Sequence, residues 1–73
     1  MEQKAKKYRE LVELKGLLRE RKKDYQTISS LMGISQSAFS NKINGKTVFS
    51  LLEALKLIKL LEINPEEAYR YFF

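Results

Sequence analysis

Apolar residues recur three and four positions apart along the whole chain, which is the spacing of amphipathic helices. The first helix is predicted over residues 2–22. Six side chains form its apolar face: Tyr8, Leu11, Val12, Leu14, Leu17 and Leu18. Gly16 lies within this helix at a cost of about 1 kcal/mol relative to alanine, and a close helix crossing at this point would account for it. No alternating apolar and polar stretch is long enough to predict a strand.

A short second helix is predicted to begin after Asp24. The carboxylate of Asp24 can accept hydrogen bonds from the free N–H groups of a first helical turn, which makes this residue a candidate N-cap. Ile28 and either Leu31 or Met32 are the apolar residues expected to face the core. Gly33 is placed to end the helix in the left-handed conformation that glycine adopts readily.

A third helix is predicted over residues 36–44, with Ser35 as its N-cap. Phe39 and Ile43 lie four residues apart, so they share the inner face of this helix. Gly45 follows and ends it.

The last third of the chain predicts two more helices. Ser50 and Glu53 have the spacing of a capping box, in which each side chain accepts a hydrogen bond from the other residue's backbone. The helix that follows is predicted to bury a stripe of apolar residues in the core: Leu51, Leu52, Leu55, Ile58 and Leu61. Residues 64–67, Asn-Pro-Glu-Glu, open a fifth helix with a cap, a proline and acids near the positive dipole end. Four aromatic side chains crowd its end: Tyr69, Tyr71, Phe72 and Phe73.

The chain has 73 residues and contains neither cysteine nor histidine. Disulfides and cysteine nucleophiles are therefore excluded, and the commonest general base and metal ligand is missing. Because so short a chain leaves little room for a substrate pocket, we expect one domain over residues 1–73, without catalytic activity, metal, cofactor or small-molecule ligand. No apolar run approaches the ~20 residues of a membrane span and no signal peptide is visible, so we expect a cytoplasmic protein that does not bind membranes.

The charge of the chain is unevenly distributed. The net charge is +5, but residues 1–46 carry eleven basic and five acidic side chains, whereas residues 47–73 carry three basic and four acidic ones. Between Tyr25 and Leu52 there is no acidic residue. A surface that meets phosphates is expected to look like this, because carboxylates there would be repelled.

Residues 32–35, Met-Gly-Ile-Ser, have the form of the turn in a helix-turn-helix, whose second helix enters the major groove of DNA with its N-terminal end. Side chains that can contact base edges cluster at this end: Ser35, Gln36, Ser37, Ser40 and Asn41. A glutamine can bond adenine N6 and N7, and a serine can pair with several base edges. Lys42 and Lys46 follow at positions suited to phosphates. The alternative is that these residues form an ordinary solvated helix face.

At these residues the sequence resembles the λ-repressor-like family, the Cro/Xre class of helix-turn-helix regulators. The segments that carry the resemblance are Met32 to Ser37, Asn44 to Thr47, Ser50 to Glu53 and Asn64 to Glu67. It implies an all-α, five-helix λ-repressor-like DNA-binding domain, and both ends of the chain are similar to small Cro-like regulators of bacteriophages and prophages. Where some family members bury an ion pair, this sequence has the apolar Leu18 and Ile43. Replacing a buried ion pair by apolar residues is often neutral or stabilising.

The resemblance also implies roles for single residues. The first residues of the third helix touch bases in this family, which maps to Gln36 and Ser37, with Asn41 one turn later. Contacts to the DNA backbone, or support for the base-reading side chains, are implied for Tyr25, Gln26, Ser35, Ser40, Lys42, Asn44 and Lys46. In the family a glutamine usually holds the place of Tyr25. The Tyr25 ring could plug the corner between the first two helices, or its hydroxyl could meet a phosphate.

We therefore predict a sequence-specific transcription regulator, a Cro-like repressor that binds pseudo-palindromic operator DNA as a homodimer and occludes a promoter. The aromatic density at the C-terminal end provides candidates for the dimer contact: Tyr69, Tyr71, Phe72 and Phe73. Two alternatives stay open. One is a DNA-binding antitoxin of a toxin–antitoxin pair, in which these aromatic residues would contact the toxin. The other is a protein-interaction module without DNA binding.

Overall fold

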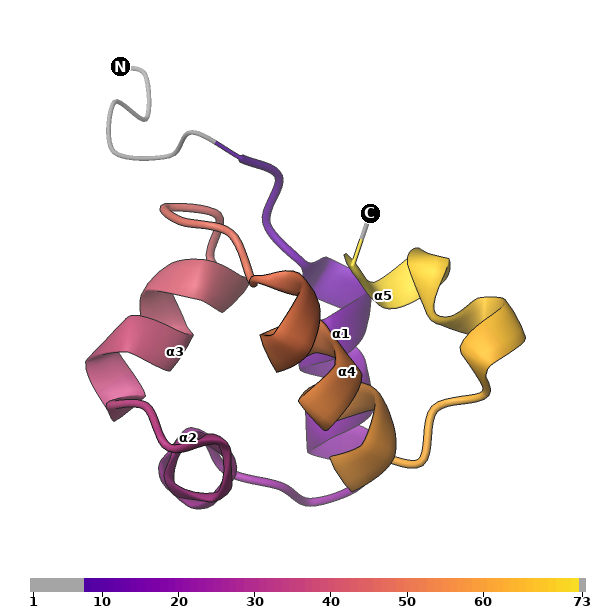
Figure 1. The fold of residues 1–73 in the computed structure, drawn as a ribbon, viewed down its shortest axis with the longest axis horizontal. Helices are drawn as coiled ribbons and strands as arrows, with labels where there is room; N and C mark the ends of the chain where they lie inside the picture. Colours follow the sequence, from indigo (N-terminus) through magenta and orange to yellow (C-terminus); the bar gives the residue numbers. More distant parts are fainter. Residues whose placement is uncertain (1–7, 73) are drawn as a thin grey trace.

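A computed structural model describes residues 8–72, and all of its regular structure is helical (Figure 1). The elements are α1 (Val12–Glu20), α2 (Tyr25–Met32), α3 (Gln36–Ile43), α4 (Leu51–Leu60), the short 3₁₀ helix η1 (Pro65–Glu67) and α5 (Tyr69–Phe72). The predicted all-α fold with five helices is confirmed. The predicted fifth helix is divided in two, since η1 follows the Asn64 cap and α5 is a single turn.

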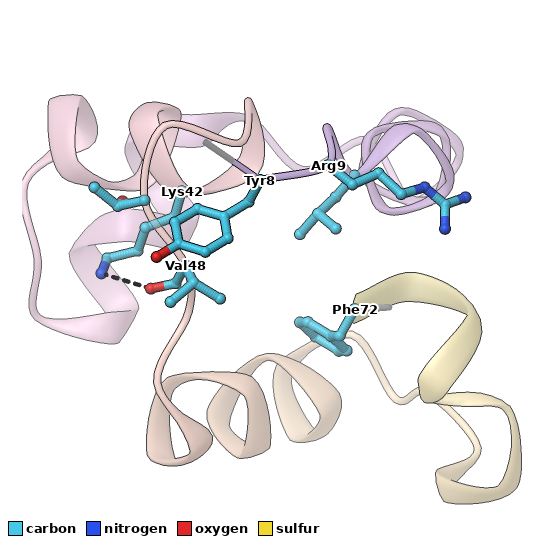
Figure 2. Close-up of a pocket in the computed structure, with 7 residues that line it drawn as sticks. Tyr8, Arg9, Lys42, Val48 and Phe72 are labelled. Carbon is cyan, nitrogen blue, oxygen red and sulfur yellow. Dashed lines mark hydrogen bonds between the residues drawn. The ribbon is translucent and has the colours of Figure 1, made fainter. Parts of the chain in front are cut away.

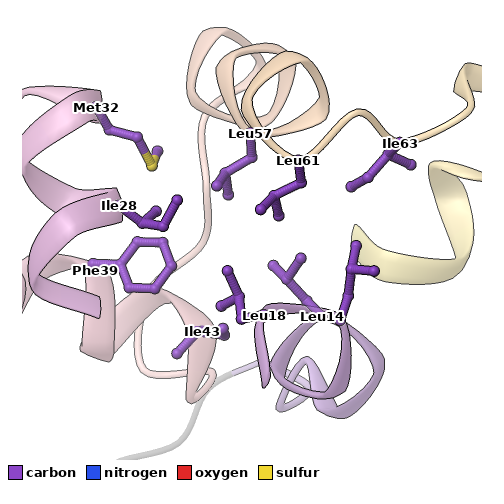
Figure 3. Packing of buried hydrophobic residues seen from close by; sticks show 10 residues of the cluster. Leu14, Leu18, Ile28, Met32, Phe39, Ile43, Leu57, Leu61 and Ile63 are labelled. Carbon is purple, nitrogen blue, oxygen red and sulfur yellow. The ribbon is translucent and has the colours of Figure 1, made fainter. Parts of the chain in front are cut away.

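The core is formed by ten apolar side chains that α1 to α4 and the segment after α4 direct toward one another (Figure 3). They are Leu14, Leu17, Leu18, Ile28, Met32, Phe39, Ile43, Leu57, Leu61 and Ile63. In α2, Met32 is buried and Leu31 is exposed, which settles the alternative left open by the sequence. Leu18 and Ile43 are both buried and belong to the core.

The first helix begins at Val12, and the prediction of a helix through residues 8–11 was wrong. The backbone N–H of Tyr8 donates to the carbonyl of Gly45 at 2.8 Å, and that of Leu11 donates to the carbonyl of Ile43 at 3.0 Å. This segment therefore pairs with the end of α3, and its bonds replace those of a further helical turn. Val12 is 64% exposed, and Tyr8 is exposed as well, so neither belongs to the apolar face. The predicted start at residue 2 lies outside the described residues.

The glycines at positions 16 and 45 have different environments. A side chain on Gly45 would collide with the Tyr8 carbonyl, and the φ of this residue, 88°, is in the left-handed region. Glycine is thus required where the N-terminal segment crosses the end of α3. Around Gly16, by contrast, an added methyl group would meet no atom within 4 Å. The close helix crossing expected there is absent.

The predicted caps and turns are confirmed. The Asp24 carboxylate accepts from the Thr27 N–H at 2.8 Å, and the Ser35 hydroxyl accepts from the Ala38 N–H at 3.0 Å. Gly33 ends α2 with a φ of 77°. Ser50 and its partner three residues on, Glu53, form both hydrogen bonds of the capping box.

The predicted apolar stripe of α4 is only partly in the core. Leu61 is buried and Ile58 packs against the core as predicted, but the three leucines before them are exposed, contrary to the prediction. Leu51 and Leu52 are 76% and 75% exposed, and Leu55 is also exposed. Leu57 is fully buried in their place. Leu57 follows Leu55 by two residues, which corresponds to a rotation of about 200° around a helix. The side of α4 that faces the core is therefore nearly opposite to the side that carries Leu55. Ile58 and Leu60 pack against the core on either side of Leu57, and the core that the described residues form is too small to cover the opposite side of α4 as well.

We expect substitution by alanine to change the stability of the protein in opposite directions at Gly16 and at Gly45. Gly16→Ala should raise the free energy of unfolding by about 0.4–1 kcal/mol, because alanine favours the helix and restricts the unfolded chain. Gly45→Ala should lower it by more than that amount, since both the φ of this residue and the Tyr8 carbonyl oppose a side chain. Urea unfolding of the two variants and the parent checks both signs, and a neutral Gly45→Ala would contradict the crossing described.

Candidate nucleic-acid interface

α2, a tight turn and α3 form a compact pair of helices that pack directly on one another. The turn is closed by the N–H of Gly33, which donates to Ser30, and by the N–H of Ile34, which donates to the carbonyl of Ser29 at 3.0 Å. Ile34 packs against the core. The first residue of α3 is therefore held at a defined place relative to α2.

The outer side of α3 is polar and its inner side is fully buried. Phe39 and Ile43 point into the core, while Gln36 and Ser37 in the first turn are exposed. Asn41, one turn further, is partly exposed. The three residues predicted to contact bases thus lie on the solvent side of a helix whose opposite side is anchored by packing.

The turn after α3 is built on the backbone of Asn41. Its carbonyl oxygen accepts from the N–H of Lys46 at 2.9 Å and from the N–H of Thr47 at 3.3 Å. The Asn44 amide donates to the Ser40 hydroxyl at 3.2 Å, so these two predicted supporting residues bind each other. Lys46 is exposed at the end of this turn and its ammonium is available to solvent.

Lys42 is held within the protein. Its ammonium lies 3.2 Å from a carboxylate oxygen of Glu53 in α4. It also donates to the carbonyl of Val48 at 3.4 Å (Figure 2). Two roles were predicted for Lys42: a contact to the DNA backbone, or support for the base-reading side chains. The geometry favours the second role, because Lys42 joins the end of α3 to the start of α4. The sequence could not show this contact, since Glu53 is eleven residues away on another helix.

Tyr25 lies at the corner between the first two helices, partly buried. Its ring meets that of Phe39 edge to face, with centroids 5.1 Å apart. The packing interpretation of Tyr25 is therefore confirmed, and a phosphate contact by its hydroxyl stays a prediction. Gln26, the next residue, is exposed on the first turn of α2.

A basic hollow lies beside the first residue of α3. Its volume is about 420 Å³, and its lining is Lys15, Leu18, Arg19, Lys23, Asp24, Tyr25 and Gln36. Lys15 pairs with Glu10, whereas Arg19 and Lys23 are both exposed. The structure thus brings cations of α1 and of the segment after it next to Gln36. Sequence reasoning missed Arg19, because its proximity to α3 depends on how the helices pack.

A second hollow, of about 210 Å³, lies between the N-terminal segment and the α3–α4 connection (Figure 2). Tyr8, Val48 and Phe72 line it together with the carbon chain of Lys42. Its walls are mostly apolar, and the charged end of Lys42 is turned to the carbonyl of Val48. Over residues 8–72 no three acidic side chains are grouped as a metal site would need.

The C-terminal aromatic residues differ in their surroundings. Phe72 packs on Phe49, with ring centroids 6.0 Å apart, and Tyr71 is also packed against the core. Tyr69 is exposed. Phe73, the fourth candidate for a dimer contact, lies outside the described residues.

One protein family described as "Protein of unknown function (DUF739)" matches residues 7–73, and the chain belongs to this family. No curated protein matches the sequence. Within the described residues 8–72, no helix has the length and apolar character needed to cross a membrane.

The carboxyl of Glu53 should make the stability of the protein sensitive to acid. Its pKa is lowered, chiefly by the hydrogen bond from the Ser50 backbone and further by Lys42. A lowered pKa stabilises the fold above the unfolded pKa of about 4.3, and this stability is lost as the pH falls through the folded value. The pKa of Asp24 is lowered in the same direction by its hydrogen bonds with Thr27.

We expect Glu53→Gln to keep the cap, because the amide oxygen can still accept from Ser50, and to remove the charge that pairs with Lys42. The variant should be less stable than the parent at pH 7, and the difference should shrink at about pH 3. Urea unfolding at both pH values measures this. Glu66→Gln, which removes an exposed carboxylate from η1, is the control and should leave the pH dependence of the parent largely intact.

Proposed function

We propose that this chain is a helix-turn-helix DNA-binding protein that regulates transcription, as its resemblance to the Cro/Xre class implies. The observation that carries the proposal is the first turn of α3. Gln36 and Ser37 are exposed there, while Phe39 behind them is fully buried and fixes the helix. A helix that presents polar side chains from a rigid support is what reading base edges in the major groove requires.

The charges around this turn support a DNA partner. α2, α3 and the connection to α4 contain no acidic residue, and Lys46 extends into solvent at the far end of α3. Arg19 and Lys23 lie in the hollow beside Gln36. Cations on both sides of the polar turn would allow phosphates to be bound on either side of the bases that α3 reads.

The action we propose is occupation of a promoter. A body of 37 × 25 × 23 Å bound at a promoter through α3 would act by excluding other proteins from the same DNA. Binding to a pseudo-palindromic operator as a homodimer in the cytoplasm belongs to the same proposal. Two α3 helices would then enter successive major grooves about 34–36 Å apart.

Selection of duplex DNA from a random pool, at about physiological salt, tests the proposal directly. We expect an enriched motif with two half-sites about one helical turn apart. An enriched single half-site would keep the DNA-binding proposal and remove the dimer. Weak binding that disappears with salt and enriches no motif would contradict a sequence-specific regulator.

Gln36→Ala should weaken binding to the selected site by about 1–3 kcal/mol and relax the preference at one base pair, because a base-edge contact is lost. Titration of the parent and the variant against the selected duplex and against single-base variants of it measures both effects. Equal losses on the selected and on random DNA would show that Gln36 does not read a base.

Lys46→Ala should weaken binding to all sequences alike, because a phosphate contact carries no sequence information. The slope of log affinity against log salt should fall by about one. Arg70→Ala is the control, since Arg70 is an exposed basic residue on α5, which lies on the side of the body away from α3 (Figure 1). A slope unchanged by Lys46→Ala, or reduced as much by Arg70→Ala, would contradict this role.

A further inference from the structure

α4 exposes three leucines on one side, and we refer to Leu51, Leu52 and Leu55 as the leucine face. Their positions span about 100° of the helix surface, and the buried Leu57 lies on the other side. Single exposed leucines are common on soluble proteins, but several that adjoin one another mark an interaction site. Leu31, at the end of α2, is exposed too.

The leucine face adjoins a groove between α2 and α4. Met32, Leu52, Leu55 and the stems of Lys56 and Lys59 line most of it, and its volume is about 320 Å³. Lys56 donates to the carbonyl of Met32 at 3.4 Å, which ties α4 to the end of α2 beside this groove. The ammonium of Lys56 is thereby drawn toward a carbonyl at the end of a helix, where a positive charge is favoured.

We propose that a second copy of this chain covers the leucine face and that the two copies are related by a two-fold axis. Such an interface uses the same patch on both copies, so the patch must be complementary to itself. Here one patch offers both parts of such a contact, because the exposed Leu51 is followed directly by Leu52, which lines the groove with Met32. Each copy can place its Leu51 against the groove of the other. The centre is apolar and the lysines lie at the rim, as in homodimer interfaces.

The size of the patch sets the strength of the association. The leucine face and its groove comprise far fewer side chains than the ~20–30 per partner of a stable standard interface. The dimer should therefore be weak in solution and become dominant on DNA with two half-sites, where bound copies are held at high local concentration. The strengthening of the dimer on DNA rests on the proposed function, whereas the weak dimer in free solution does not.

The position of the leucine face relative to α3 suits a dimer that binds two half-sites. The ion pair between Lys42 and Glu53 joins the last turn of α3 to the first turn of α4, where the leucine face begins. A dimer through α4 would thus link the two α3 helices through rigid elements. The described body measures 37 × 25 × 23 Å, so the centres of two touching copies can lie at the spacing of one DNA turn.

Site-specific cross-linking tests the proposal, because the chain contains no cysteine of its own. Under mild oxidation, Leu52→Cys should form a disulfide-linked dimer at high protein concentration, and more of it when the selected two-half-site duplex is present. Tyr69→Cys is the matched control, since Tyr69 is about equally exposed and belongs to the alternative, aromatic surface on α5. Cross-linking through Tyr69→Cys alone would overturn the proposal in favour of α5.

A charge variant supplies the second measurement. Leu51→Glu combined with Leu52→Glu alters only exposed side chains, so circular dichroism and thermal unfolding should stay close to those of the parent. Sedimentation should show a weak monomer–dimer equilibrium for the parent and a monomer for the variant. Affinity for the two-half-site duplex should fall by about 10²-fold or more, while affinity for a single half-site is unchanged.

The outcomes separate the two proposals. If neither protein binds DNA but the parent dimerises and the variant does not, the proposed function fails and the leucine face remains the dimer surface. A parent that sediments as a monomer at all concentrations, and whose Leu52→Cys variant does not cross-link on the duplex, overturns the inference. A different protein bound stoichiometrically at this face in place of a second copy would overturn it as well.

Discussion

Phe39 is the contact on which the rest of the structure depends. Its ring is fully buried and meets two other rings edge to face, that of Tyr25 at 5.1 Å and that of Phe49 at 5.6 Å, and Phe49 in turn meets Phe72. This row of aromatic rings joins the start of α2, the middle of α3, the connection to α4 and the last helix. Each edge-to-face pair adds roughly 0.5–1.5 kcal/mol beyond the burial of its area. Because Phe39 lies on α3, the same contact that completes the core also determines which side of α3 faces solvent.

The end of α3 is held from two further directions. The N-terminal segment donates backbone hydrogen bonds to the carbonyls of Ile43 and Gly45, and Lys42 pairs with Glu53 of α4. None of these contacts uses the exposed side of α3. This arrangement suits the DNA-binding role that we propose, since a polar side chain reads a partner well only when its own backbone does not move. Among residues 8–72, the leucines on the outer side of α4 remain exposed.

Local features of the fold could be predicted well. Asp24, Ser35 and Ser50 cap their helices as expected, and Gly33 ends α2 in the left-handed conformation. The candidate base-reading residues could be predicted for the same reason, because a cap and a turn fix where α3 begins and the positions of Phe39 and Ile43 fix its inner face. Prediction was wrong for three of the five α4 residues that helical spacing placed in the core. The leucines of α4 have helical spacing, yet only Leu57 and residues near it reach the core.

The sequence by itself thus determined the number, order and limits of most helices, the turn between α2 and α3, and the uneven distribution of charge. These depend on hydrogen bonds and dihedral preferences within a few residues of each other, or on composition alone. Only the tertiary structure decided where α1 begins, which side of α4 is buried, that Lys42 is held by Glu53, and that Arg19 lies near Gln36. Each of these features depends on contacts between segments that are distant in sequence. A periodic apolar pattern predicts that a helix has a buried side, but it does not predict how much of the helix surface the neighbouring elements cover.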